Sequence, residues 1–526
     1  MIFDPDYWKD EARSTLEIQE IFTNDQLINI ITKARQALLS SPISGRLFRQ
    51  NRRLVFLIIE NGKPFIHRPK WREMRSVLLR IAKWLKITPN GSILNSKPPR
   101  ELIDDMLDFA DPSLPELFHI AHTPFFAPSG ELVSTPGYHE GTQCFYWPDP
   151  ALESLHLPTI VTKAEIDTAR EILLSDLLID FPFKTEADRA HAIAALLHLF
   201  VRRMIIGPTP LHLTEASAPR SGKGLLVNGI SQIALGENCT GMTLAEGENQ
   251  ISRQLVSALL TGRSIMFLDN FPQGRVLGSA TLASILTSEM FEDRKLLTNQ
   301  MITVANRALW LCTANTPLIS NEMVPRCVRI RLVPGIENPS ARTGFKHADL
   351  LRWTRENRAE LVRALLILVK AWIQAGMPSY HGRTKGAFED WTQVMGGILE
   401  VAGIPGFLEN EDELRENADE ELEAWREFVT TWHERFDAHP VLPNMLTELC
   451  MREDLMLGFL RDGSPRSRQT QMGRLLKGAR DRVFGGFRIV LVKNAGHRGQ
   501  WYRLAPVHPS GQEVPQPRLA SIGKRQ

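Results

Sequence analysis

The residues best suited to chemistry lie in PLHLTEASAPRSGKGLLVNGISQIALG, residues 210–236. Its pattern predicts a strand, a loop and then a helix that ends at Gly236. A phosphate-binding loop needs this order, because amides at a helix N-terminus face the phosphates while a lysine reaches the terminal ones. The residues expected to contact a nucleotide are Ser217, Arg220, Ser221, Gly222, Lys223, Gly224 and Leu225.

Two positions depart from the usual GxxxxGK[ST] loop. Ser217 replaces the first glycine, and Gly224 replaces the hydroxyl residue that normally contacts magnesium. SGKG before a helix is also compatible with an ordinary helix start, so the loop alone leaves both interpretations open.

Polar residues at the ends of later segments strengthen the phosphate-loop interpretation. RSIMFLDNF is an apolar strand pattern that carries Asp269, placed to hold magnesium beside the loop. NRALWLCTANTP is a second strand and carries Asn315, whose amide can orient a water or contact a terminal phosphate. Arg326 follows, where an arginine can stabilise transition-state charge across a subunit boundary. Each residue alone also fits a turn or a solvated surface, but in this order they predict an ATPase that uses ATP and Mg²⁺.

These segments carry a resemblance to a known family. APRSGKGLL, GRSIMFLDNF, SEMFEDRKLL, LWLCTANTP and PRCVRIRL resemble the AAA+ ATPase of phage- and plasmid-encoded replication proteins. Their order is similar to that of superfamily-three and MCM-type helicases, which often accompany primases on mobile elements. DFPFKTEADRAHAIAALL and GQWYRL resemble these proteins too. The resemblance implies a hexameric ring, ATP-driven movement on DNA and a C-terminal winged helix. It makes Lys223 the phosphate lysine, Asp269 the magnesium carboxylate, Asn315 the first sensor and Arg326 the finger.

The catalytic base departs from this family. Most such ATPases have a second carboxylate after the magnesium-binding Asp, whereas this chain has Asn270, and an amide cannot accept the proton of the attacking water. Either another acid acts as the base or hydrolysis is slow. The acids nearest in the sequence are Glu246, Glu248 and Glu289. Nucleotide binding is therefore better supported than turnover.

Two segments are candidates for contacting DNA. In helicases of this type a hairpin before the sensor strand grips DNA, and here SEMFEDRKLLTNQMITVANRALW supplies Arg294, Lys295 and Arg307. A solvated loop explains these cations equally well. Residues 451–526 hold 15 Lys or Arg against 5 Asp or Glu, an excess of 10 in a chain whose net charge is +2. Candidate phosphate contacts there are Arg468, Arg474, Lys477 and Arg498.

The C-terminal pattern predicts a helix followed by a hairpin. SPRSRQTQMGRLLKGARDRVF is a basic amphipathic helix pattern, and FRIVLVKNAGHRGQWYRL predicts two strands. This is the closing order of a winged helix. The residues expected to face inward are Met472, Leu475, Leu476 and Val483. A basic domain that binds an acidic partner, such as residues 409–423, is the alternative.

The elements that must position these residues suggest an α/β protein with several domains. We expect an N-terminal α+β domain (1–160), an AAA+ core (161–375), a helical lid with an acidic linker (376–437), a winged helix (438–505) and a disordered tail (506–526). One helix should begin at the capping-box pattern of Thr185 and Asp188. No apolar run reaches the ~20 residues that span a bilayer, and no signal peptide is recognised, so we expect a cytoplasmic protein without membrane contact.

The sequence therefore predicts an ATP-dependent DNA helicase or translocase that replicates a mobile element, with DNA and other copies of itself as partners. One alternative is a DNA-bound regulatory or defence NTPase that switches on nucleotide without unwinding. Another is a loader for a partner primase, since the chain has no primase signature of its own. RLFRQNRRLVFLII in the N-terminal region is either a basic edge that contacts DNA or a strand with solvated arginines.

Overall fold

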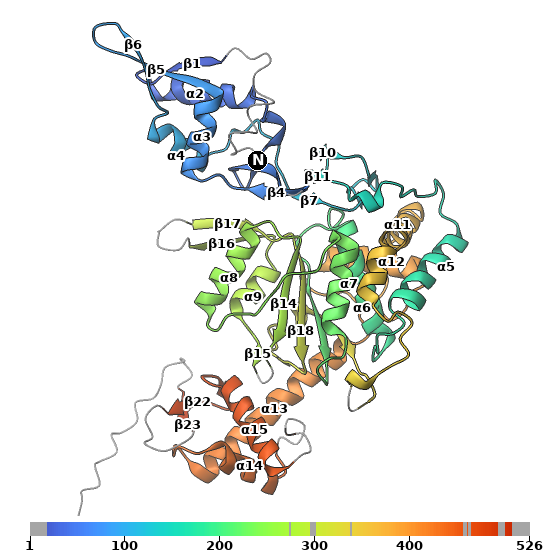
Figure 1. Cartoon of the computed structure of the whole chain (residues 1–526). Helices are drawn as coiled ribbons and strands as arrows, with labels where there is room; N and C mark the ends of the chain where they lie inside the picture. Colours follow the sequence, from blue (N-terminus) through green and yellow to red (C-terminus); the bar gives the residue numbers. More distant parts are fainter. Residues whose placement is uncertain are drawn as a thin grey trace, which may run out of the picture.

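The computed structural model describes residues 18–60, 62–272, 275–294, 301–336, 339–455, 460, 464–492 and 500–507. Within these ranges the chain is a mixed α/β structure in three regions (Figure 1). An N-terminal region lies at one end of the view and an α/β core in the middle. A C-terminal region lies at the other end and is joined to the core by the long helix α13 (Glu411–Phe436). None of the described helices is long and apolar enough to cross a membrane.

A five-stranded parallel sheet organises the core. Its strand order is β13-β14-β18-β12-β20, with every neighbouring pair parallel. Strands β12, β14, β18 and β20 are largely buried, because helices cover both faces of the sheet. Their bounds are β12 Leu211–Ala216, β13 Gly241–Met242, β14 Ile265–Phe271, β18 Leu309–Asn315 and β20 Cys327–Leu332. The carboxyl ends of β12, β14 and β18 therefore meet at one edge.

Two apolar clusters fill the two sides of this sheet. One contains residues of α6, α7, α11 and α12, and the other contains residues of α8 and α9. The core helices are α5 Lys163–Glu171, η3 Ile172–Leu177, α6 Glu186–Val201, α7 Lys223–Leu235, α8 Glu248–Leu260, α9 Ala280–Leu286, α10 Leu350–Glu356, α11 Arg358–Gln374 and α12 Glu389–Val401. Short elements complete the core: β15 Val276–Leu277, β16 Met290–Arg294, β17 Met301–Ala305, β19 Leu318–Ile319, η4 Val324–Arg326 and η5 Pro339–Ala341.

Two predicted helix ends in the core are confirmed. Thr185 caps α6 and forms a capping box with Asp188, as the sequence indicates. Gly236 ends α7 with a φ of 77°, a left-handed conformation that glycine adopts without strain. These two helices bury apolar residues against the same face of the sheet, so their ends fix the position of the loop between β12 and α7.

The N-terminal region packs three helices against two small sheets. The sheets have the orders β1-β5-β6 and β2-β3-β4, and the predicted strand in RLFRQNRRLVFLII corresponds to β2 and β3. The bounds are β1 Gln19–Phe22, α2 Leu27–Leu39, η1 Ser44–Arg46, β2 Leu47–Gln50, β3 Arg53–Glu60, β4 Lys63–His67, α3 Trp71–Ile81, β5 Ala82–Ile87, β6 Ile93–Asn95 and α4 Arg100–Asp108.

A connecting segment links this region to the core. It packs Leu117 and Ile120 against Phe48, Val55 and Leu57 of the β2-β3-β4 sheet. Its elements are β7 His119–Ala121, β8 Phe125–Phe126, β9 Leu132–Val133, β10 Gly137–His139, β11 Cys144–Tyr146 and η2 Pro150–Leu152.

Helix α13 belongs to two apolar cores. Leu414 near its start packs with the α/β core, whereas Trp425 and Trp432 pack in the C-terminal region. That region comprises α14 Pro443–Arg452, α15 Pro465–Gly478, β21 Val483–Phe484, β22 Phe487–Val492 and β23 Trp501–Pro506. The predicted helix and hairpin are present, but the helix is shorter than expected. Val483 lies beyond it in β21 and is 46% exposed, so the prediction that it faces inward was wrong.

Candidate nucleotide site and charged surfaces

The loop between β12 and α7 has the backbone of an anion site. Gly222 precedes α7 with a φ of 93°, a left-handed conformation that favours glycine, and an added Cβ would make only an ordinary contact of 3.4 Å with the Phe181 ring. Ser221 Oγ donates to the Ala218 carbonyl at 2.6 Å, which closes the loop on itself. The first amides of α7 have no partner within the helix and carry the positive end of its dipole. An anion placed here would accept hydrogen bonds from them.

Lys223 holds a buried positive charge without a carboxylate partner among the described residues. Its Nζ donates to Asn315 Oδ1 at 2.7 Å and to the Ala218 carbonyl at 3.3 Å, and both acceptors are neutral. The side chain is only 9% exposed, and burial lowers the pKa of its ammonium group. A phosphate at the loop would supply the missing negative charge.

The strand ends bring Asp269 to the same place. Thr313 Oγ1 donates to Asp269 Oδ1 at 2.8 Å and accepts from the Asn270 amide at 2.8 Å. Thr313 and Asn315 are two residues apart on β18 and so lie on one face of the sheet. Asp269 is exposed, and its carboxylate is oriented by Thr313. The structure thus gathers Lys223, Asn315 and Asp269 at one sheet edge, as the sequence predicted.

The donor set suits a magnesium ion that is shared with phosphates. The described residues contain no cluster of three or more metal-binding side chains. Mg²⁺ usually takes one or two carboxylates together with substrate phosphates and water, and Asp269 provides one such carboxylate. Gly241 on β13 keeps this place clear, because a Cβ there would lie 2.7 Å from Asp269 Cβ. A Cβ on Gly224 would meet nothing within 4 Å, so space does not prevent a hydroxyl ligand at that position.

The candidate bases differ in their other contacts. Glu248 Oε2 accepts from Ser279 Oγ at 3.0 Å and from the Thr281 amide at 2.9 Å, which ties it to the start of α9. Asn270 has a φ of 48°, a conformation that Asn tolerates better than most residues. Glu246 is exposed and makes no such cap.

A cavity beside the loop was missed by the sequence analysis. It has a volume of about 450 Å³, within the usual range of about 300–1,000 Å³ for small-molecule sites. Arg220, Ser221, Gly222 and Leu225 of the loop line one side of it. The other side is lined by Asp180, Phe181, Pro182, Pro334, Pro339, Arg342, Phe345, His347, Ala348, Asp349, Leu350 and Leu351. The loop residues on one side were expected to contact a nucleotide, but for the other side the sequence offered only the DFPF segment, which came from resemblance and carried no role.

The arginines near β20 fall into two groups. Arg329 pairs with Glu215 at 2.6 Å, and Arg331 pairs with Asp188 at 3.2 Å and with Glu413. These two are largely buried and hold strands and helices together. Arg326 instead donates from Nε to the Ala283 carbonyl at 3.0 Å and makes no ion pair with any described residue. It does not join the site within this chain.

The hairpin β16–β17 forms as predicted, with Met290 opposite Ala305 and Arg294 opposite Met301. Lys295 and the side chain of Arg294 lie outside the described residues. Arg307, just beyond the hairpin, turns toward the connecting segment and donates to the Phe118 carbonyl at 3.2 Å. It is therefore engaged within the chain and does not project with the hairpin.

Four cations of the C-terminal region lie on α15. This helix carries Arg466, Arg468, Arg474 and Lys477 and no acidic residue, while Met472, Leu475 and Leu476 are buried as predicted. Arg474 and Lys477 are exposed, and Arg468 lies 3.4 Å from Met451 Sδ. Arg498 lies outside the described residues.

Comparisons with known proteins give distant structural likeness only. No family model matches the chain, and no curated protein matches it. The A form apo structure of the NrS-1 C terminal region is 11% identical with a TM-score of 0.38, covering 90% of this chain and 97% of that one. The SCCmec type IV Cch active helicase is 12% identical with a TM-score of 0.29, covering 86% and 90%. The JCV helicase has a TM-score of 0.22 at 11% identity, covering 47% and 68%. Scores this low carry no argument about function.

Proposed function

We propose that this chain is an ATP-dependent DNA helicase or translocase of a mobile genetic element and acts as a ring of identical subunits. One observation carries the proposal: Lys223, Asp269 and Asn315 meet at the carboxyl edge of a parallel sheet, beside a cavity of about 450 Å³. A phosphate loop and a cavity of nucleoside size are adjacent, which suits a nucleoside triphosphate.

Each residue then has a distinct task. The amides of α7 and the Lys223 ammonium group bind the phosphates, and Lys223 leaves the Asn315 amide when it does so. Asn315 is then free to orient a water or contact the terminal phosphate. Asp269 would hold Mg²⁺, which would neutralise charge on the phosphates. The lining of Phe181, Phe345 and Leu351 gives the base an apolar site.

Movement on DNA needs surfaces outside this site. The proposed surfaces are the exposed cations of α15 and the hairpin β16–β17, whose second strand leads through residues 306–308 into β18. Because Asn315 ends β18, a shift of the nucleotide site is transmitted along one strand to the base of the hairpin. Arg326 would act on a neighbouring subunit, since it has no role at its own site.

A strand-displacement assay tests the proposal. Purified full-length chain should separate a forked duplex when ATP and Mg²⁺ are present and should fail with a non-hydrolysable analogue. Imaging of the same particles should show closed rings. Separation that is equally fast without ATP, or an ATP-dependent activity in monomers alone, would overturn the proposal.

Asn270 favours one second candidate, a DNA-bound NTPase that switches on nucleotide binding without unwinding. Without a carboxylate next to Asp269, the water lacks its usual base, and bound nucleotide would persist. This candidate predicts ATP-dependent DNA affinity with a turnover too slow to support displacement. A single-turnover hydrolysis measurement alongside DNA binding separates the two.

A further inference from the structure

Residues 46–100 of the N-terminal region carry a strong positive charge. They hold 14 Lys or Arg against 2 Asp or Glu, an excess of 12 in a chain whose net charge is +2. One of the two acids, Glu73, accepts from the Lys70 amide at 2.7 Å and lies 2.9 Å from His67 Nε2, so it is engaged locally. Such an excess makes the region a candidate for binding a polyanion.

Many of these cations have no carboxylate partner. Arg49 pairs with Glu116 at 3.1 Å, and Lys83 pairs with Glu20 at 2.8 Å. The others divide between a few further ion pairs and cations that stand alone. The cations that form no ion pair with any described residue are Arg52, Arg68, Lys70, Arg72, Arg75, Arg80, Lys86 and Lys97.

Helix α3 turns one face into the N-terminal region and the other face outward. Met74, Val77 and Leu78 are fully buried there with residues of α2, α4 and β3. An α-helix repeats every 3.6 residues, so the side chains on the far side of its axis lie outward. The members of the outward face and its borders are Arg72, Arg75, Ser76, Leu79 and Arg80.

The arginines of this face are spread along the helix. Arg72 is exposed in the first turn, and Arg75 is partly exposed one turn later. Arg80 Nη1 donates to the Ser76 carbonyl at 3.1 Å, so its side chain lies back along the helix. Leu79 is 45% exposed among them. The outward face of α3 thus presents cations along its length and a single large apolar residue.

The β5–β6 hairpin follows α3 directly and adds a cation on the same side. Trp84 Nε1 donates to the Leu78 carbonyl of α3 at 2.8 Å, so this face of the sheet packs against the helix. Lys86 is two residues further along β5 and therefore shares that face, and its side chain is exposed. We refer to Arg72, Arg75, Arg80 and Lys86 as the α3 surface.

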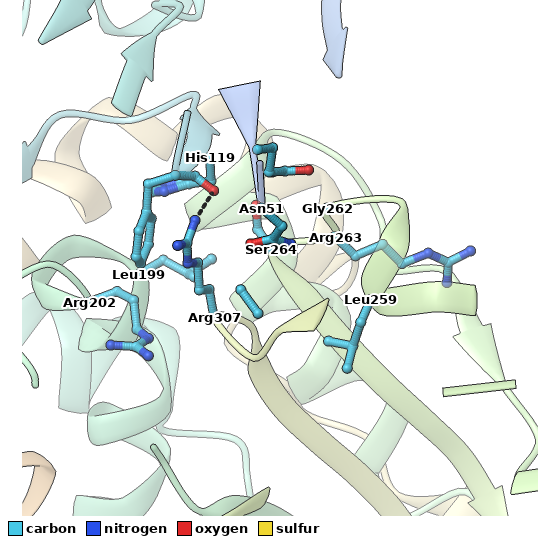
Figure 2. Close-up of a pocket in the computed structure, with 12 residues that line it drawn as sticks. Asn51, His119, Leu199, Arg202, Leu259, Gly262, Arg263, Ser264 and Arg307 are labelled. Carbon is cyan, nitrogen blue, oxygen red and sulfur yellow. Dashed lines mark hydrogen bonds between the residues drawn. The ribbon is translucent and has the colours of Figure 1, made fainter. Parts of the chain in front are cut away.

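The α3 surface lies on the side of the N-terminal region away from the α/β core. Leu54 and Phe56 pack with α3 on one face of the β2-β3-β4 sheet, whereas Val55 packs on the connecting segment at the other face. The connecting segment is tied to the α/β core where Arg307 donates to the Phe118 carbonyl at 3.2 Å, the hydrogen bond drawn in Figure 2. Figure 1 shows the β5–β6 hairpin at the end of the region far from that core. The α/β core therefore does not cover the α3 surface.

The form of this surface favours duplex DNA over other polyanions. The 11 residues of α3 make a helix about 16 Å long, and the major groove of B-DNA, about 12 Å wide, admits an α-helix. The major groove of double-stranded RNA is too narrow for side chains to read. A membrane surface takes the apolar face of a helix, and that face of α3 is already buried.

We propose that the α3 surface binds duplex DNA, with the outward face of α3 in the major groove and Lys86 on the phosphate backbone beside it. Arginine can contact both base edges and phosphates in this position. The inference rests on the proposed function for DNA as the polymer. It gives the chain a duplex contact at the end of the molecule opposite α15 (Figure 1).

Position 79 tests the α3 surface with a matched pair of variants. Leu79→Glu and Leu79→Gln differ by one charge at nearly the same shape, and equal melting temperatures will establish that both are folded. Binding of a labelled DNA duplex by the full chain, without nucleotide, is followed by fluorescence anisotropy. The Glu variant should bind at least about tenfold more weakly than the Gln variant, because a carboxylate in the groove repels the phosphates and competes for the arginines.

A salt titration counts the contacts. Arg72→Gln with Lys86→Gln removes two cations of the α3 surface. The equal-charge control is Lys163→Gln with Arg415→Gln, two exposed sites on α5 and α13. The slope of log affinity against log KCl should fall by about 1.8 for two lost contacts, at about 0.9 per phosphate on duplex DNA. The control should leave the slope unchanged.

Each outcome decides the proposal. A weaker Glu variant together with a reduced slope supports it, even in a chain that fails to separate strands, where only the proposed function fails. Equal affinities of the two position-79 variants, or an unchanged slope, overturn it, and strand separation by the same chain would leave the proposed function intact. A duplex RNA of the same sequence that competes as well as the DNA overturns the groove placement.

Phosphatidylserine vesicles are the arm for a membrane surface. If they bind the Gln variant more tightly than the Glu variant while the two duplex affinities are equal, the α3 surface is a lipid site and the DNA assignment is wrong. Vesicle binding that is the same in both variants, with the tenfold difference on DNA, supports the assignment.

Discussion

The nucleotide site and helix α15 handle positive charge in opposite ways. At the nucleotide site a single ammonium group is nearly buried and is held 2.7 Å from a neutral amide oxygen. On α15 several cations lie at the surface of a helix without acidic residues. The first arrangement depends on the position of individual atoms, and the second depends on summed charge that salt can screen. A single mutation at the nucleotide site should therefore abolish nucleotide binding. On α15, each mutation should instead lower DNA affinity by a small step.

The largest effect should come from Lys223→Ala. Nucleotide binding and DNA-stimulated hydrolysis should be lost, because the side chain serves the phosphates and only contacts a loop carbonyl and Asn315 otherwise. The melting temperature should change little. Isothermal titration with ATP and Mg²⁺ measures the binding, and Lys163→Ala, an exposed lysine of α5, is the control. Wild-type ATP affinity in the Lys223 variant would refute the phosphate-loop assignment.

Arg326→Ala comes next. If the active unit is a ring, hydrolysis should fall by a factor on the order of 10³ while ATP still binds, because the guanidinium would act across a subunit boundary. Mixing this variant with the Lys223 variant should restore some activity, since one intact interface can form in a mixed ring. No recovery at any mixing ratio would count against a shared site.

Arg331 is the matched contrast to Arg326 on the same segment. Asp188 is fully buried, and Arg331→Ala leaves it without its 3.2 Å ion pair. Removing one partner of a buried pair typically destabilises a protein by about 3–5 kcal/mol. Urea unfolding should show a loss of that order for Arg331→Ala and a small one for Arg326→Ala. Equal losses would mean that Arg326 is also structural.

The sequence predicted the part of the site that lies at the ends of successive strands and helices. Lys223, Asp269 and Asn315 were predicted together because each stands at an end of a periodic segment, and parallel strands bring such ends to one edge. The cavity was not predictable in this way, since Phe181 and Phe345 are far apart in sequence and come to line one cavity only in the folded chain, where α10 packs on α7. Arg307 was a candidate DNA contact of the hairpin segment, but its ring partner Phe118 lies in the connecting segment, which the local sequence around Arg307 does not reveal.

A gain is expected from Gly224→Ser. An added Cβ at this first-turn position meets nothing within 4 Å, and a hydroxyl there would supply the magnesium ligand that the loop lacks. The Mg²⁺ concentration for half-maximal hydrolysis should fall by about tenfold, the factor that 1.4 kcal/mol gives. Losing a helical glycine should also raise stability slightly. An unchanged Mg²⁺ dependence with wild-type ATP binding would place the ion away from this position.

The smallest effect should come from α15. Arg474 and Lys477 are exposed, so neither charge is needed to hold the helix, whose apolar face is carried by Met472, Leu475 and Leu476. Changing both to Gln should leave ATP binding and thermal stability intact. If each contacts a phosphate, the slope of log affinity for duplex DNA against log salt should fall by about 1.8, at about 0.9 per contact. Affinity at low salt should weaken in two similar steps as the changes are combined.

A salt titration of duplex binding, with Lys163→Gln and Arg415→Gln combined as the equal-charge control, measures this. A similar flattening in the control would show that net charge matters and that α15 is not a specific DNA surface. If the slope is unchanged in both the α15 variant and the control, the C-terminal region becomes a candidate for contacts with another protein. DNA affinity would then not fall stepwise as cations of α15 are removed. Only the nucleotide site would remain as an example of a charge with a defined role.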